Sequence, residues 1–147
     1  MPPPTAYHIG YADGASRWTQ NLTSAAWALY SPSHDLLHTN DICLGSTTNN
    51  QEEYTAVIGL LIEANHHHIC HLSILLDSQL VVLQLNKVYC VHDPCLFRKY
   101  LHIRLLSWHF DSITFTHIQR QFNQIADNMP NIILDWHISH QYIFTYT

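Results

Sequence analysis

The sequence predicts an α/β domain built on a mixed five-stranded sheet, in which three antiparallel strands are followed by two parallel strands and helices flank the sheet. Short alternating segments joined by brief polar turns fill the first third of the chain, which is typical of an antiparallel meander. Two later strand-like segments are each entered through a helix-like segment, which is typical of parallel strands. The chain has 147 residues, 47% of them hydrophobic and 12% charged, which is enough for one compact core.

The first three strands are expected at residues 7–13, 24–30 and 36–44. Along the first of them, alternate side chains share one face, and Asp13 is the last residue on that face. The Asp13-Gly14 pair is expected to end this strand, since glycine permits a turn or the close approach of a ligand to the backbone. The turn before the third strand contains Pro32.

An amphipathic helix is expected to follow the meander, with Asn49 or Asn50 capping its start and acidic residues in its first turn. Counting at helical spacing from Glu53 yields an apolar face, which contains Ala56, Val57, Leu60, Leu61 and Ala64. Glu53 therefore lies at the N-terminal end of this face, whereas Glu52 is rotated about 100° away and is interpreted as an ordinary first-turn acid. A carboxylate on a buried face is costly unless something pairs with it.

The second half of the chain alternates between helices and strands. We expect a central strand at 71–76 ending on Asp77, a short helix at 78–86, a helix from Pro94 to about His109, and a strand at 112–118. A last helical region opens at 123–127, where Pro130 interrupts it or resets its start. The domain is expected to span residues 7–135, with a linker at 1–6 and a tail at 136–147.

Four acidic residues occupy the ends of elements. Asp13 and Asp77 end strands, while Glu53 and Asp127 begin helices. If the first and fourth strands are parallel neighbours, their carboxyl ends lie side by side, where open α/β sheets bind ligands. Clustered carboxylates repel one another and need a counter-ion, for which Mg²⁺ or Mn²⁺ is suited. Two such ions can activate water and stabilise the leaving oxygen of a phosphodiester.

Four motifs follow one another along the chain: YADGAS at 11–16, TNNQEEY at 48–54, LDSQLVV at 76–82, and HIQR at 117–120 followed by NQIAD at 123–127. In sequence, order and spacing they resemble the motifs of type 1 ribonuclease H domains, in particular the compact form of plant proteins and reverse-transcribing elements. The resemblance implies the ribonuclease H-like fold and endonucleolytic hydrolysis of the RNA strand of an RNA–DNA hybrid, leaving 3′-hydroxyl and 5′-phosphate ends.

By the same resemblance, Asp13, Glu53, Asp77 and Asp127 hold two divalent metal ions, Mg²⁺ or Mn²⁺. His117 matches a histidine that assists proton transfer or product release; the alternative is a strand-end residue on the inner face of the sheet. The implied substrate contacts are Gly14, Ala15, Ser16, Asn50 and Gln79. Contacts to the 2′-hydroxyl group distinguish RNA from DNA.

Charge sets limits on the function. The formal net charge is -5 and there are only six Lys and Arg, which argues against a surface that coats nucleic acid generally. The basic insertion with which some members grip the hybrid is absent, so we expect weak hybrid binding by the isolated domain, or help from a fused reverse transcriptase. The alternative is a catalytically silent module that serves as a binding or spacer domain. A DNA-cutting or DNA-joining relative fits the second and third motifs poorly.

Histidines and cysteines suggest two further sites. His66, His67, His68, Cys70 and His71 form a local cluster, but adjacent ligands rarely close one tetrahedron and no distant pair is evident. We interpret them as solvated, with a helix-end zinc site as the alternative. The four cysteines form no CxxC pair and are expected to be reduced. Without a signal peptide or a long apolar span, we expect an intracellular protein of the cytoplasm or nucleus, monomeric as an isolated domain and not inserted in a membrane.

Overall fold

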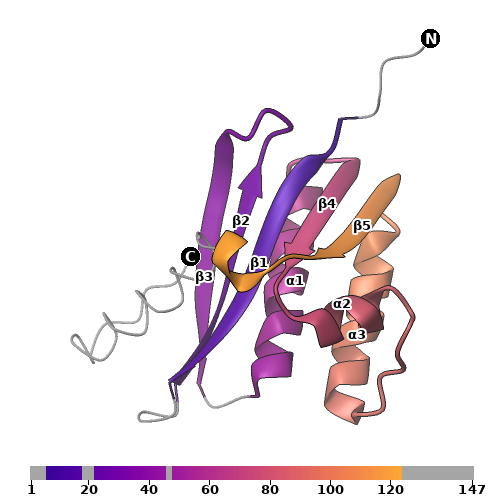
Figure 1. Ribbon diagram of the computed structural model, residues 1–147. Helices are drawn as coiled ribbons and strands as arrows, with labels where there is room; N and C mark the ends of the chain where they lie inside the picture. Colours follow the sequence, from indigo (N-terminus) through magenta and orange to yellow (C-terminus); the bar gives the residue numbers. More distant parts are fainter. Residues whose placement is uncertain (1–5, 18–21, 46–47, 124–147) are drawn as a thin grey trace.

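The computed structural model describes residues 6–17, 22–45 and 48–123, and these form a five-stranded sheet with the strand order β3-β2-β1-β4-β5 (Figure 1). The pairs β1–β2 and β2–β3 are antiparallel, whereas β1–β4 and β4–β5 are parallel. The predicted mixed sheet is confirmed. In chain order the elements are β1 (His8–Arg17), β2 (Leu22–Tyr30), β3 (Leu36–Gly45), α1 (Asn49–His66), β4 (His71–Leu76), α2 (Gln79–Leu85), α3 (Pro94–Ser107), β5 (Ser112–His117) and a 3₁₀ turn, η1 (Arg120–Phe122).

The central strand β1 is longer than predicted. It does not end at Asp13 but continues to Arg17, paired on one side with β2. Its parallel partner β4 stops earlier, at the pair Ala12↔Leu76. The expectation that Asp13-Gly14 ends the strand was therefore wrong, because β2 supplies a partner along the whole of β1. Beyond Ala12 the sheet has a step, at which β1 continues and β4 does not.

Helix α1 begins at Asn49, so its N-cap lies one residue before the earlier of the two expected caps. Thr48, not Asn49 or Asn50, is the N-cap, and its side chain accepts a hydrogen bond from the Gln51 backbone N–H at 3.2 Å. The predicted apolar face is confirmed, since Ala56, Val57, Leu60, Leu61 and Ala64 are all fully buried. This face packs on β1 and β2. Gly59 allows the close approach, because a Cβ there would lie 2.5 Å from the Trp27 ring.

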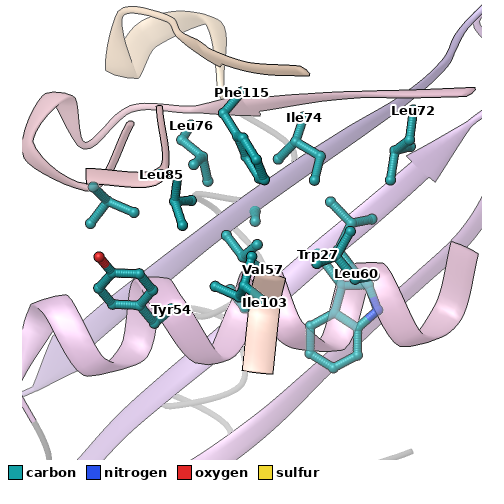
Figure 2. Packing of buried hydrophobic residues seen from close by; sticks show 14 of the residues in the cluster. Trp27, Tyr54, Val57, Leu60, Leu72, Ile74, Leu76, Leu85, Ile103 and Phe115 are labelled. Carbon is teal, nitrogen blue, oxygen red and sulfur yellow. The ribbon is translucent and has the colours of Figure 1, made fainter. Parts of the chain in front are cut away.

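The main core lies between α1 and the sheet, and α3 packs against α1 (Figure 2). From β4, alternate side chains enter this core: Leu72, Ile74 and Leu76. Figure 2 shows Ile103 of α3 near Val57 of α1. Burial of one such aliphatic side chain contributes about 1.5–3 kcal/mol to folding, so this layer holds α1 firmly over the strands.

The later elements follow the sequence closely. Ser78 caps α2, and Asp93 caps α3 by accepting from the Cys95 and Leu96 backbone N–H groups at 2.8 and 3.0 Å. Helix α3 ends at Ser107 rather than near His109, and β5 ends at His117. The expected last helix after Asn123, the tail at 136–147 and the linker at 1–5 lie outside the described residues.

Two smaller expectations can be compared with the structure. Cys70, Cys90 and Cys95 are exposed and form no disulfide in the described part of the chain, and their reduced state stays a prediction. Among the described residues, no helix has both the length and the apolar character needed to cross a membrane.

Candidate active site

The step in the sheet brings Asp13 and Asp77 together. Each of them follows the last parallel pair, Ala12↔Leu76, so the two carboxylates leave neighbouring strands at the same level. Glu53 reaches the same point from the first turns of α1. One carboxylate oxygen from each of the three residues lies within 4.8 Å of the others. The structure therefore assembles three of the four predicted acids, while Asp127 lies outside the described residues.

This acid cluster is poorly solvated. Asp13 is fully buried, Glu53 is 7% exposed, and Asp77 is half-buried. Glu53 Oε1 accepts a hydrogen bond from the Gly14 backbone N–H at 3.3 Å. The pKa of Glu53 is raised to about 7, chiefly by burial; hydrogen bonds with Asp13 and with the Gly14 N–H lower it, and the charges of Asp77 and Glu52 raise it. An isolated cluster of this kind therefore favours either a retained proton or a bound cation.

Glu52 is also part of this buried region, contrary to its interpretation as an ordinary first-turn acid. It is fully buried. Gly14 lies directly against it, since a Cβ on Gly14 would lie 2.5 Å from Glu52 Cβ. Helical spacing alone placed Glu52 off the apolar face of α1. The part of β1 beyond Ala12, however, also covers the start of α1 and so buries Glu52. Gly14 is thus required by close packing of the strand on the helix, in addition to any contact with substrate.

Asn123 was not predicted as a site residue, and it connects two parts of the site. It is fully buried just after η1, and its Nδ2 lies 3.4 Å from Asp77 Oδ2 and 3.3 Å from the Ala12 carbonyl oxygen. A single amide thus connects the segment after β5 to the middle of β1 and to Asp77, which directly follows β4. The position of Asn123 in the NQIAD motif could have marked it as a site residue. The motif does not reveal its partners, however, because Ala12 and Asp77 are distant in sequence.

Replacing Asn123 with alanine is expected to destabilise the domain by about 1–3 kcal/mol, because a buried carbonyl and a carboxylate lose their donor. Cleavage activity should fall as well, since Asp77 loses a positioning contact. Asn86→Ala is the matched control: Asn86 Nδ2 donates to the Phe115 carbonyl oxygen at 3.0 Å, away from the acids. Denaturant unfolding and a hybrid-cleavage assay should show lost stability in both variants and lost activity only in Asn123→Ala. Equal activity in the two variants would contradict a positioning role.

The other predicted site residues surround this cluster. His117 is exposed at the end of β5, and its Cα pairs with Leu76, next to Asp77. This exposure does not fit the alternative of an inner-face structural residue. Asn50 is half-buried in the first turn of α1, and Gln79 is exposed at the start of α2. The backbone of Ala15 and Ser16 continues β1 past the acids, paired with Ser24 and Thr23.

Comparison with known proteins agrees with this arrangement. A family model described as reverse transcriptase-like matches residues 11–131, which include every residue of the site. The chain belongs to this family. A curated relative, ribonuclease HI of Halobacterium salinarum, is 36% identical over 125 residues, covering 85% of this chain and 63% of its own length. The bifunctional protein Rv2228c of Mycobacterium tuberculosis is 29% identical, and the match covers 84% of this chain and 34% of the relative.

Solved structures share the fold. The crystal structure of the Halobacterium salinarum ribonuclease H1 superposes with a TM-score of 0.83 at 35% identity, covering 88% of this chain and 98% of that one. The N-terminal ribonuclease H domain of Rv2228c has a TM-score of 0.86 at 26% identity, with 93% and 99% covered. LC11 ribonuclease H1, crystallised with an RNA/DNA hybrid, has a TM-score of 0.83 at 27% identity, with 89% and 99% covered. The ribonuclease H fold of this chain is therefore established.

Proposed function

We propose that this domain is an endoribonuclease that hydrolyses the RNA strand of RNA–DNA hybrids with the help of divalent metal ions. The observation that carries the proposal is the set of three carboxylates whose oxygens lie within 4.8 Å of one another at the step of the sheet. Support comes from the names of the ribonuclease H relatives and from the hybrid bound to the LC11 enzyme. The chain spans 63% of the Halobacterium relative and 34% of Rv2228c, so the proposal concerns this domain.

The donor set fits a hard divalent cation. All of its members are carboxylates, which suit Mg²⁺ or Mn²⁺ better than a soft metal ion. The raised pKa of Glu53 reflects mainly the cost of burying a carboxylate, to which the neighbouring charge of Asp77 adds, and a bound cation would offset both. We assign Asp13, Glu53, Asp77 and Asp127 as ligands of two ions. When bound, such ions lower the pKa of water and stabilise charge on the phosphodiester.

The remaining residues are assigned to substrate and proton handling. His117 is exposed at the end of β5, level with Leu76 and so near Asp77, where we propose that its imidazole assists proton transfer or product release. Gly14, Ala15 and Ser16 follow Asp13 along β1, past the end of β4, and we propose that they contact the RNA strand. Asn50 and Gln79, from the starts of α1 and α2, complete this surface.

Few cations are available to hold the phosphates. Of the six Lys and Arg, the Arg104 guanidinium lies 4.9 Å from the Tyr100 ring centroid and donates to the Leu85 carbonyl oxygen, while Lys99 Nζ donates to Thr55 Oγ1 at 3.1 Å. These two side chains serve the fold. We therefore propose that the isolated domain binds hybrid weakly and acts best with a fused or associated reverse transcriptase. The same scarcity favours the second candidate, a domain that binds without cutting.

A cleavage assay tests the proposal. Labelled RNA–DNA hybrid, double-stranded RNA and double-stranded DNA are incubated with the domain, with and without Mg²⁺. The expected result is Mg²⁺-dependent cleavage of the RNA strand of the hybrid alone, with products ending in 3′-hydroxyl and 5′-phosphate. Binding of the hybrid without cleavage, in either Mg²⁺ or Mn²⁺, would support the silent module instead.

A further inference from the structure

A second group of metal-ligating side chains lies at the opposite end of α1. It contains His38 of β3, Glu63 in the last turn of α1, and His67 just after that helix. One ligand atom from each residue lies within 4.8 Å of the others. Glu63 follows Glu53 by ten residues, which is about 15 Å along the helix axis, so this His/Glu cluster is separate from the acid cluster.

The contacts within the His/Glu cluster already converge on one carboxylate. His38 Nε2 lies 2.6 Å from Glu63 Oε1, and His67 Nε2 lies 3.4 Å from Glu63 Oε2. Glu63 and His67 are four residues apart, which places them on one face of the helix. His38 is the distant partner that the histidine-rich segment lacked in the sequence, and it comes from the edge strand of the sheet.

We propose that His38, Glu63 and His67 bind a zinc ion. Two imidazole nitrogens and one carboxylate suit Zn²⁺ and its neighbours in the transition series, whereas Mg²⁺ prefers oxygen ligands only. Bond lengths of about 2.0–2.2 Å place the ligand atoms of a tetrahedral zinc ion about 3.4 Å apart. The observed separations are 2.6 Å from His38 Nε2 to Glu63 Oε1 and 3.4 Å from His67 Nε2 to Glu63 Oε2, and one ligand atom from each residue lies within 4.8 Å of the others, so side-chain adjustments can bring the three ligands around one ion.

The cluster is open enough for the ion to enter and to keep a water ligand. The side chains of His38 and His67 are 38% and 45% exposed, while that of Glu63 is 16% exposed. Glu63 also borders a cavity of about 470 Å³ that is lined by Trp27, Asn40, Gly59, Ile62, Asn65 and His66. Water from this side is available as the fourth ligand, which a three-residue zinc site requires.

Such an ion would link the edge strand β3 to the end of α1. In the described part of the chain, β3 has few other contacts with α1, so the link would stabilise the free side of the sheet. This role needs no contribution from the acid cluster, and the inference stands whether or not the domain cleaves hybrids.

Zinc titration by calorimetry, in millimolar Mg²⁺ to satisfy the acid cluster, tests the site. Wild type is expected to bind one Zn²⁺ with a dissociation constant below about 10 μM. His38→Gln and His67→Gln should each weaken binding by about tenfold or more, since even second-shell changes cost that much. His102→Gln, an exposed histidine on α3, is the matched control and should bind as wild type does.

Cobalt substitution and the melting temperature supply independent measurements. Co²⁺ should give the visible absorption of a tetrahedral site in wild type and in Asp77→Asn, but not in His38→Gln. One equivalent of Zn²⁺ should raise the melting temperature of wild type and leave that of His38→Gln unchanged. Equal zinc affinity in wild type and His38→Gln, or loss of zinc binding in Asp77→Asn alone, would overturn the proposal.

Discussion

Replacing Asp77 with asparagine is expected to reduce Mg²⁺-dependent cleavage of a labelled RNA–DNA hybrid by about a thousandfold or more, which corresponds to about 4 kcal/mol of transition-state stabilisation. The substitution keeps the size of the side chain but removes one of the three clustered negative charges. Asp77 is half-buried at the end of β4, so its amide replacement is accommodated without a cavity. The measurement is the initial cleavage rate at saturating Mg²⁺.

Asp111→Asn is the matched control for this loss. Asp111 is an exposed acid just before β5, at the opposite end of the parallel strands β4 and β5 from Asp77, and undergoes the same chemical change. It should cleave at the wild-type rate. Asp77→Asn should also remain folded without metal and should titrate Glu53 at a lower pH, because the charge of Asp77 raises the pKa of Glu53. Wild-type cleavage by a folded Asp77→Asn variant would refute the assigned metal site.

The metal-free domain is expected to lose stability as the pH rises from about 4.5 to about 7. Glu53 has an ordinary pKa of 4.5 when unfolded and about 7 when folded. Between these values the unfolded chain releases its proton first, so ionisation favours unfolding. Below the lower value both states hold the proton and the full stability is present. The difference of 2.5 pKa units corresponds to about 3 kcal/mol, which is lost as the pH passes through the folded pKa.

The variant Glu53→Gln separates the effect of the Glu53 carboxyl on stability from the effects of other ionisable groups. Other ionisable groups also contribute to the pH dependence of stability, so the informative quantity is the difference between wild type and variant in the free energy of unfolding. With metal removed by a chelator, that difference should grow with pH as wild type weakens. Millimolar Mg²⁺ should restore wild type near neutral pH and have little effect on Glu53→Gln. Parallel pH profiles for the two proteins would contradict the buried, perturbed carboxyl.

The elements with strong local signals were predictable from the sequence. The strand at 71–76 was predicted with its observed ends, because a run rich in Leu and Ile stops at Asp77. Two parallel strands and a helix start sufficed to predict that Asp13, Glu53 and Asp77 meet. Pro94 marked the start of α3 for a physical reason, namely the fixed φ angle of proline, which suits the first helical turn.

The errors arose where distant segments decide the local structure. Asp13-Gly14 has the local signal of a strand end, but β2 extends the pairing to Arg17. Helical spacing places Glu52 off the apolar face, yet the part of β1 beyond Ala12 packs against it and buries it. The contacts of Asn123 with Asp77, and of His38 with Glu63, join segments that no local pattern relates. The end of β1, the burial of Glu52 and these two contacts could be identified only from the three-dimensional structure.

The central place of β1 also has a consequence for folding. Its antiparallel partner β2 is reached through a short connection, whereas its parallel partner β4 is separated from it by two strands and a helix. Closing that long loop delays pairing, so we expect the meander to form before β4 docks. Asp13 is therefore expected to reach its place in the sheet before Asp77 does. Recovery of the complete acid cluster during refolding should consequently coincide with the last major folding step, and not with the first appearance of the sheet.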